Sequence, residues 1–258
     1  MYTITAVSYG AGTNSTALLI ECVKRAIKVD IILFADTGGE RPETYNYIKI
    51  FNRWLAENGM PEIITVKKVR ANGEVLTLEQ NCLEQNMLPS IAYGFKSCSQ
   101  KFKIQPQDKF MNNYEPAKQL WKQGGRVTKF IGYDADESHR TQKDYSDDKY
   151  QFDYPLVRWG MGRRECVQTI IDAGLPLPGK SSCWFCPNSR KNEIKHLAAV
   201  HPDLAQRAIA MENNAHLTQV AGLGRNFAWG DLLATDDMFN DLYERDTAMP
   251  CGCYDGGE

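Results

Sequence analysis

Residues 8–19 read SYGAGTNSTALL, and this stretch decides the fold. Apolar residues up to Val7 break into glycines and hydroxyl residues, and apolar residues then return at helical spacing from Ala17 onward. The pattern predicts a strand, a tight turn and a helix. The free N–H groups and partial positive charge of a helix start suit an anion. An ordinary capped turn has the same pattern, so the residues alone leave both interpretations open.

Strand and helix signals continue to alternate after this first unit. A buried strand is predicted over 29–34, where only Asp30 interrupts the apolar run, and Pro42 opens the next helix. Two more strands are expected over 62–69 and 127–131. The alternation predicts an α/β fold of Rossmann type, an open, mainly parallel twisted sheet with helices on both faces.

Three polar segments, 8–16, 35–44 and 132–140, each follow a predicted strand. In open parallel sheets ligands bind beyond the carboxyl ends of the strands. We therefore expect these segments to meet at one edge of the sheet.

The rest of the chain carries no clear sheet pattern. Residues 71–126 indicate helices and loops, and the polar stretch 141–153 indicates an exposed loop or a mobile flap. A helix is expected from about Arg163 to Ala173, and helices dominate beyond Lys180. This organisation predicts a nucleotide-binding domain over 1–180 and a helical region with a cysteine metal site over 181–258.

Bulk properties exclude several classes of protein. The chain has 258 residues, a formal net charge of −2, a pI near 6.1 and a mean hydropathy of −0.45. No apolar run approaches a membrane span of about 20 residues. We expect no leader peptide, because the first residues lack the charged-then-apolar pattern with a small-residue cleavage site. We expect a soluble cytoplasmic protein without a membrane partner. No global field attracts nucleic acid, although a local basic patch remains compatible with the charge.

The cysteines fall into singles and two close pairs. Cys183 and Cys186 form a C-x-x-C turn, and Cys251 and Cys253 form C-x-C. Four thiolates in two turns suit tetrahedral Zn²⁺ or an iron–sulfur cluster, and the ligands do not distinguish the two. Unbound thiols, or a metal that only clamps the C-terminal region, are the simpler alternatives.

Cys98 is a separate candidate because it lies among Lys96, Lys101 and Lys103. Nearby positive charge lowers the pKa of a thiol and makes it nucleophilic or a ready ligand. The same lysines could hold phosphate, or the cysteine could simply occupy a solvated basic loop.

Residues 132–140 read GYDADESHR and place Asp134, Glu137 and Arg140 after a strand end. Mg²⁺ in proteins binds few carboxylates together with substrate phosphates, so carboxylates beside a phosphate loop suggest it. A solvated acidic loop is the alternative.

These pieces, in this order, resemble the phosphoadenosine-phosphosulfate (PAPS) reductase family within the PP-loop, or N-type ATP pyrophosphatase, superfamily. GAGTNS stands in the place of the family's opening loop, ADTGGERPET in that of its HDTG…PET signature, and CSQKFKIQP in that of its cysteine-and-basic segment. GYDADESHR and the C-x-x-C pair match the last two elements. The resemblance covers residues 4 to about 190.

The resemblance implies an adenine nucleotide, ATP or PAPS, at the sheet edge. The first loop would hold its phosphates and the turn 34–38 would lie near the adenosine. It also implies Cys98 as a further cluster ligand beside Cys183 and Cys186. The residues expected to bind the nucleotide are Ser8, Gly10, Gly12, Thr13, Asn14, Ser15, Phe34, Asp36, Thr37, Gly38 and Gly132.

Several residues depart from the family pattern. The aspartate of the family's loop is Asn14 here, and its double cysteine is Cys98-Ser99. The arginine expected after the strand is Asp134, which should repel a sulfonucleotide. The reductase's C-terminal catalytic cysteine motif is absent, with PCGCYDGG its nearest counterpart. These departures make sulfonucleotide reduction less expected than nucleotide binding.

The leading hypothesis is therefore an ATP pyrophosphatase-type transferase. A substrate oxygen, for instance of a nucleobase or a nucleic acid, attacks the α-phosphate of Mg²⁺-ATP, and a sulfur or nitrogen nucleophile then displaces AMP. The first alternative is an oxidoreductase or sulfotransferase acting on PAPS through Cys98 or Cys253. The second is a nucleotide-binding protein with structural zinc and no catalysis. The residues expected to carry the chemistry are Cys98, Lys101, Lys103, Asp134, Glu137 and Arg140.

Overall fold

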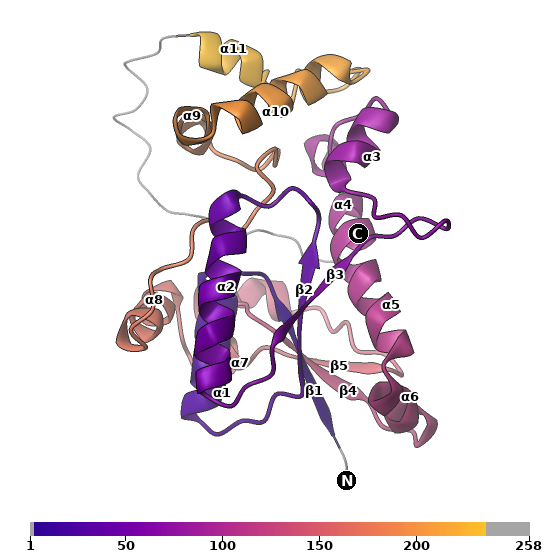
Figure 1. The fold of residues 1–258 in the computed structure, drawn as a ribbon, viewed down its shortest axis with the longest axis vertical. Helices are drawn as coiled ribbons and strands as arrows, with labels where there is room; N and C mark the ends of the chain where they lie inside the picture. Colours follow the sequence, from indigo (N-terminus) through magenta and orange to yellow (C-terminus); the bar gives the residue numbers. More distant parts are fainter. Residues whose placement is uncertain (1–2, 236–258) are drawn as a thin grey trace. The chain divides into compact units, whose positions relative to one another are not determined.

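The computed structural model describes residues 3–235. They form two compact units, each built from several stretches of the chain (Figure 1). The first unit contains the described residues up to Ala35 together with Pro42–Val66 and Gln105–Ser181. The second contains Asp36–Arg41, Lys67–Ile104 and the described residues from Ser182 onward.

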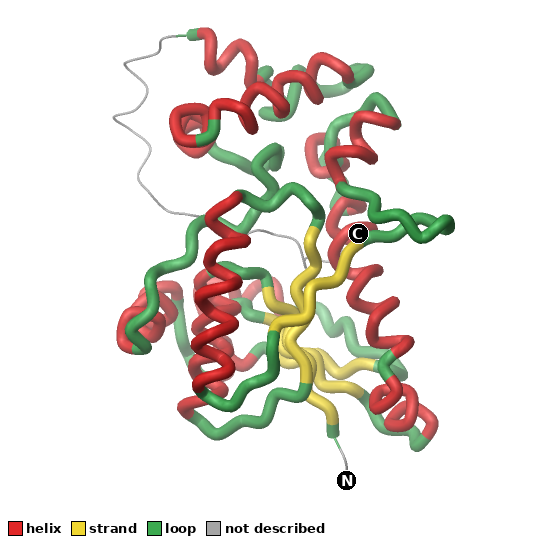
Figure 2. The backbone as a smooth tube through the Cα atoms, viewed as in Figure 1, coloured by secondary structure: helices red, strands yellow, loops and turns green. Residues whose placement is uncertain are grey.

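A five-stranded sheet forms the centre of the first unit (Figure 2). Its spatial order is β3-β2-β1-β4-β5, and the pairs β1–β2, β1–β4 and β4–β5 are parallel. The chain thus builds to one side of β1 first and to the other side afterwards. The strands are β1 (Ile4–Tyr9), β2 (Ile31–Asp36), β3 (Ile63–Lys67), β4 (Val127–Ile131) and β5 (Tyr150–Asp153).

Helices cover both faces of this sheet because successive side chains along a strand point into two different apolar cores. Val7 and Tyr9 pack in the core beneath α1 and α2, whereas Ile4 and Ala6 pack in the core beneath α5 and α6 (Figure 1). The predicted α/β fold is confirmed. The helices of this unit are α1 (Thr13–Lys24), α2 (Pro42–Glu57), α5 (Gln105–Asn113), α6 (Glu115–Lys122), α7 (Pro155–Arg158) and α8 (Arg163–Asp172), with a 3₁₀ helix over Ala135–Thr141.

The expected loop over 141–153 is wrong at its end, where Tyr150–Asp153 forms the edge strand β5. Tyr150 is only 7% exposed, and the buried ammonium of Lys129 lies 5.2 Å from its ring centroid. Phe152 lies on the same side, 5.9 Å from that ammonium. The strand contributes only these two aromatic residues to the core, so its polar neighbours hide it in the sequence.

The second unit is helical in its described part, as expected for the region beyond residue 180. Trp184, Phe185 and Trp229 are at most 2% exposed and form part of its core. Its helices are α3 (Leu78–Glu84), α4 (Ser97–Ser99), α9 (Lys191–Val200), α10 (Pro202–Asn214) and α11 (Trp229–Ala234), with a 3₁₀ helix over Ser90–Tyr93 and a π-helix over Gln100–Ile104.

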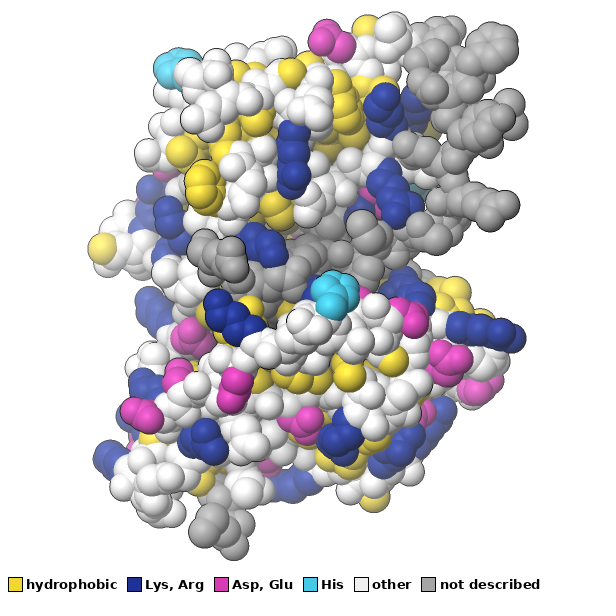
Figure 3. All heavy atoms as spheres, turned by 180° about the vertical axis from the view of Figure 1, so that it is seen from behind, with side chains coloured by type: hydrophobic (Ala, Val, Ile, Leu, Met, Phe, Trp, Pro, Cys, Tyr) yellow, Lys and Arg dark blue, Asp and Glu magenta, His cyan; other side chains and the backbone are white. Residues whose placement is uncertain are grey.

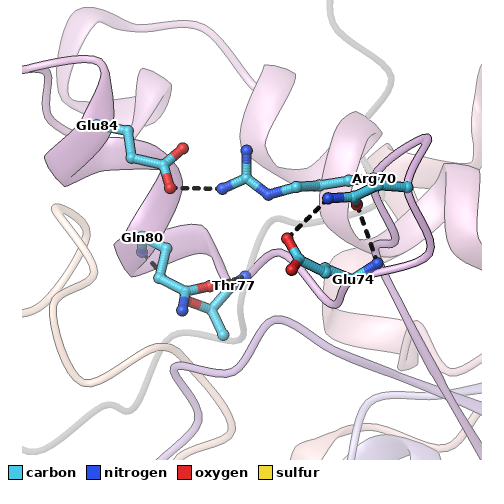
Figure 4. Close-up of polar contacts among 6 residues, drawn as sticks. Arg70, Glu74, Thr77, Gln80 and Glu84 are labelled. Atoms are coloured by element: carbon cyan, nitrogen blue, oxygen red, sulfur yellow. Dashed lines mark hydrogen bonds and ion pairs between the residues drawn. The ribbon is translucent and has the colours of Figure 1, made fainter.

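The start of α3 is held by a capping box (Figure 4). The Gln80 N–H donates to Thr77 Oγ1 at 3.1 Å, and the Thr77 N–H donates to Gln80 Oε1 at 3.0 Å. Arg70 pairs with Glu84 at the other end of the helix, 2.5 Å between Nη2 and Oε1. These contacts satisfy the helix start and tie the preceding turn to α3.

Figure 3 shows basic and acidic side chains interspersed over the lower part of the face drawn, and mostly basic ones among the charged side chains of its upper part. Among the described residues, no helix is long and apolar enough to cross a membrane.

Candidate functional site

The turn between β1 and α1 leads into a helix start that no side chain caps. The N-cap residue of α1 is Gly12, which has no side chain to bond the first-turn N–H groups, and that turn contains no acidic residue. Ser15 Oγ accepts the Gly10 N–H at 3.2 Å and lies 3.2 Å from the Gly12 carbonyl oxygen. Ala11, with φ of 56°, completes the tight turn. A compact loop with an uncapped helix start behind it is suited to phosphate oxygens.

The end of β4 approaches this loop closely. A Cβ at Gly132 would lie 3.0 Å from both Cα and N of Ser15, a separation that side chains do not normally tolerate. β1 and β4 are neighbours, and the strand order changes direction at β1. The carboxyl ends of two such strands form the crevice where open α/β sheets bind ligands. Of the three segments expected to meet, 8–16 and 132–140 therefore do.

Asn14 joins the loop to the acidic residues after β4. Its Nδ2 donates to Asp134 Oδ2 at 2.8 Å and to Glu137 Oε2 at 3.1 Å. Its Oδ1 accepts from Arg163 Nη1 at 3.0 Å. Asn14, Asp134 and Glu137 are at most 8% exposed, so this is a buried network rather than a solvated acidic loop.

Burial raises the pKa of the Asp134 carboxyl group, and the hydrogen bond from Asn14 opposes that shift. Glu137 forms an ion pair with Arg140, whose guanidinium lies 3.9 Å from the Tyr133 ring centroid. Each carboxylate thus has a donor, while the ionised form of Asp134 remains disfavoured. A cation beside Asp134 would favour ionisation.

Two polar residues of this site carry no signal in the sequence. Arg163 starts α8, 149 positions from Asn14, and only the fold brings them together. Gln107 accepts a 2.7 Å hydrogen bond from the hydroxyl of Ser8. Ser8 is predicted to bind the nucleotide, and its hydroxyl proton is already donated to Gln107. Phe34, another predicted nucleotide contact, packs its side chain in the core beneath α1.

The predicted turn residues after β2 belong to the second unit. Asp36 accepts the Gly38 N–H at 2.7 Å and pairs with Lys67 at 3.1 Å. The hydroxyl of Thr37 lies 3.2 Å from Cys183 Sγ. Thr37 thus contacts the C-x-x-C segment.

The same turn is paired with that cysteine segment through the backbone. Glu40 and Cys183 form an antiparallel bridge, and the Trp184 N–H donates to the Gly39 carbonyl at 2.8 Å. A Cβ at Gly39 would lie 2.6 Å from the Phe185 ring, which explains a glycine here. Glu40 is 3% exposed and pairs with the predicted catalytic residue Lys103 at 3.3 Å.

The described cysteines differ sharply in their surroundings. Burial raises the pKa of Cys183 well above its ordinary value, with the Glu40 carboxylate adding to the shift. Burial also raises the pKa of Cys82 to about 12, whereas Cys98 and Cys186 are only half-buried. A buried thiol of this kind ionises readily only when a cation compensates it.

The predicted metal site is only partly within the described residues. Cys183 and Cys186 share one turn, in which the Cys186 N–H donates to the Cys183 carbonyl at 3.0 Å. Cys251 and Cys253 lie outside the described residues. Within residues 3–235, no three His, Cys, Asp or Glu side chains are grouped to hold a metal ion.

The predicted catalytic residues divide between the units. Asp134, Glu137 and Arg140 lie together beside the β1–α1 loop in the first unit, and Cys98, Lys101 and Lys103 lie in the second.

Of the comparisons with known proteins, only the search of solved structures found a match. No protein-family model matches the chain, and no curated protein matches it. Among solved structures the chain is similar to the U34-tRNA thiolase NcsA from Methanococcus maripaludis with its [4Fe-4S] cluster, at 14% identity and a TM-score of 0.45. The match covers 90% of this chain and 80% of the thiolase chain.

Proposed function

We propose that this protein is an ATP pyrophosphatase-type enzyme that binds the phosphates of ATP at the β1–α1 loop. The observation that carries the proposal is the uncapped start of α1, with no acidic residue in its first turn, at the point where the strand order changes direction. Backbone N–H groups of the loop would bind the phosphate oxygens and stabilise charge that develops there.

The residues after β4 fit Mg²⁺. Asp134 and Glu137 converge on one amide group, and Mg²⁺ needs only one or two carboxylates when substrate phosphates supply further ligands. When bound, the ion would neutralise phosphate charge. Asn14 orients the two carboxylates, Arg163 holds Asn14 through its amide oxygen, and the Arg140 pair holds Glu137 in place.

The proposed reaction has two steps. An acceptor oxygen attacks the α-phosphorus of ATP, the bond from that phosphorus to the bridging oxygen breaks, and pyrophosphate leaves with the bonding electrons. The acceptor adenylate is then attacked by a sulfur or nitrogen nucleophile, and AMP departs. A nucleobase carbonyl is the acceptor we propose, because its oxygen is replaceable in this way.

A thiolate-bound Zn²⁺ or iron–sulfur cluster at Cys183 and Cys186, with Cys251 and Cys253 as further ligands and Cys98 as a candidate, completes the proposal. The buried Cys183 thiol supports it, because burial raises its pKa, so that it is a poor free nucleophile and would ionise when bound to a cation. The group would supply sulfur-transfer chemistry if it is a cluster, and would stabilise the second unit if it is zinc.

A second candidate, sulfonucleotide reduction or sulfo transfer from PAPS, rests on Cys98. It is only half-buried, in contrast to Cys22, Cys82, Cys166 and Cys183. The buried carboxylate of Asp134 beside the loop disfavours this candidate, since a sulfonucleotide carries negative charge where the family has an arginine.

The test uses the full, metal-replete chain. ATP binding is measured by calorimetry with Mg²⁺, and ATP–pyrophosphate exchange is measured with free nucleosides and bulk transfer RNA as acceptors. Gly132→Ala should weaken ATP binding about tenfold or more by displacing the loop, since its Cβ would lie 3.0 Å from Ser15 backbone atoms. Gly179→Ala is the matched control, because its Cβ would have only one neighbour, at 3.8 Å.

The outcomes separate the candidates. A chain that neither binds ATP nor exchanges pyrophosphate overturns the proposal. Binding without exchange favours a non-catalytic nucleotide-binding protein. Tight PAPS binding with sulfite release that is lost in Cys98→Ala favours the second candidate.

A further inference from the structure

Arg41 carries a charge that its own segment does not neutralise. Three charged side chains lie in Asp36–Arg41 of the second unit, and the two carboxylates are each paired with a lysine. Asp36 lies 3.1 Å from Lys67, and Glu40 lies 3.3 Å from Lys103. Arg41 is only 9% exposed, and no ion pair is found for it among the described residues. A buried cation without a counter-charge is costly, and an anion bound beside it would offset that cost.

The atoms of Arg41 without partners lie on one side of its guanidinium. Both Nε and Nη2 are buried, and neither has a hydrogen-bond partner in the described part of the chain. These two nitrogens point their N–H bonds in the same direction and form a planar fork. Such a fork matches two oxygens of a carboxylate, phosphate or sulfate group.

Arg207 shows how the same fork is used elsewhere in the second unit. Its Nε donates to Glu79 Oε1 at 3.0 Å, and its Nη2 donates to Glu79 Oε2 at 2.5 Å. One arginine of this unit therefore has its fork filled by two anionic oxygens, while the more buried Arg41 has the same fork without a partner in the described residues.

We infer that the Nε–Nη2 edge of Arg41 is a binding site for a tetrahedral oxyanion, a phosphate or a sulfate group, on the second unit. The paired carboxylates of Asp36 and Glu40 leave the guanidinium as the net charge of the segment, which selects an anionic ligand. Phosphate and sulfate present the same pair of oxygens to the fork. Arg41 belongs to the second unit and the β1–α1 loop to the first, so anion binding at Arg41 and ATP binding at the loop are tested separately.

The test observes the fork directly in the full-length chain. The side-chain Nε–H signals of arginine are recorded by NMR and assigned through the bonds. Inorganic phosphate and sodium sulfate are then titrated separately at ionic strength held constant with chloride. The Arg41 signal should shift saturably with at least one of the two anions, while the Arg207 signal should stay in place. The anion that binds more tightly identifies the kind of group.

Two variants check the assignment of the site. Arg41→Lys keeps the charge but removes the fork and should weaken anion affinity about tenfold or more. Arg207→Lys is the matched control and should leave that affinity unchanged. An Arg41 signal that neither anion shifts overturns the inference, and so does a signal that shifts with the chloride concentration instead. The inference is also overturned if folded Arg41→Lys binds the anion with the same affinity as the wild type. A signal already shifted to a bonded position, as a carboxylate of residues 236–258 would cause, also overturns it. Loss of ATP binding alone leaves this result unaffected and concerns only the proposed function.

Discussion

Replacing Asn14 by aspartate should destabilise the first unit, although aspartate is what the PP-loop resemblance places there. The wild-type amide donates to Asp134 at 2.8 Å and to Glu137 at 3.1 Å. An ionised aspartate side chain at this position could donate neither bond and would add a third negative charge. Two hydrogen bonds to charged groups are worth about 1.5–3 kcal/mol each, so the free energy of unfolding should fall by about 3–6 kcal/mol near pH 8.

The loss should depend on pH with a definite sign. Burial raises the folded-state pKa of Asp134 above its unfolded value, so the stability this group contributes is complete at low pH and declines as pH rises through the folded pKa. A third carboxylate would raise these pKa values further. The difference between wild type and Asn14→Asp should therefore narrow toward pH 4 and widen toward pH 8.

The assay is urea unfolding of the full chain, followed by circular dichroism at several pH values with and without MgCl₂. If Asp134 and Glu137 hold Mg²⁺, millimolar Mg²⁺ should restore much of the stability of Asn14→Asp but not that of Asn14→Leu. Asn72→Asp is the matched control, because Asn72 Nδ2 also contacts a carboxylate, Glu74 Oε2 at 2.9 Å, but in an exposed turn. Its cost should stay below about 1 kcal/mol. Equal stability of Asn14→Asp and wild type at pH 8 without Mg²⁺ would refute the reasoning.

Three further predictions concern the second unit. Glu212→Ala should lower the free energy of unfolding, measured by urea unfolding, by about 3 kcal/mol. The substitution removes the buried carboxylate that accepts the N–H groups of Leu223 at 2.9 Å and of Trp229 at 2.8 Å. In metal-free native protein at pH 8, iodoacetamide should modify Cys98 well before Cys183, because Cys98 is only half-buried and burial raises the pKa of Cys183. Peptide mass spectrometry measures the order of modification, and a Cys183 that reacts first would contradict the prediction. After anaerobic purification, Cys183→Ser should contain far less zinc or iron than wild type by elemental analysis while retaining ATP binding, and unchanged metal content would exclude Cys183 as a ligand.

The sequence predicts the central fold because its signals are local. The apolar stretch ending at Val7, the small residues from Gly10 and the helical spacing from Ala17 each report the conformation of a few neighbouring residues. The structure places β1 and α1 accordingly. The edge strand β5 was not predicted, because only Tyr150 and Phe152 of this strand contribute to the core.

The side-chain partners of the candidate site could not be predicted in the same way. Arg163 bonds Asn14 across 149 positions, and Thr37 meets Cys183 across 146. No periodicity encodes such pairs, because they depend on where strands and helices place their ends. The unpaired guanidinium edge of Arg41 is also invisible in the sequence, where a glutamate stands directly beside it.

The asparagine at position 14, where the family that the sequence resembles has an aspartate, gains a physical meaning from these partners. Asp134 and Glu137 both present oxygens to position 14, and only a side chain with N–H groups can bond both when they are ionised. Asn14 thus keeps two negative charges in the network where an aspartate would make three. Arg163 donates to the amide oxygen of Asn14, so both ends of the amide group are hydrogen-bonded. The departure at position 14 and the acidic residue at position 134 are therefore one compensated arrangement, which supports a site that binds phosphate together with a cation.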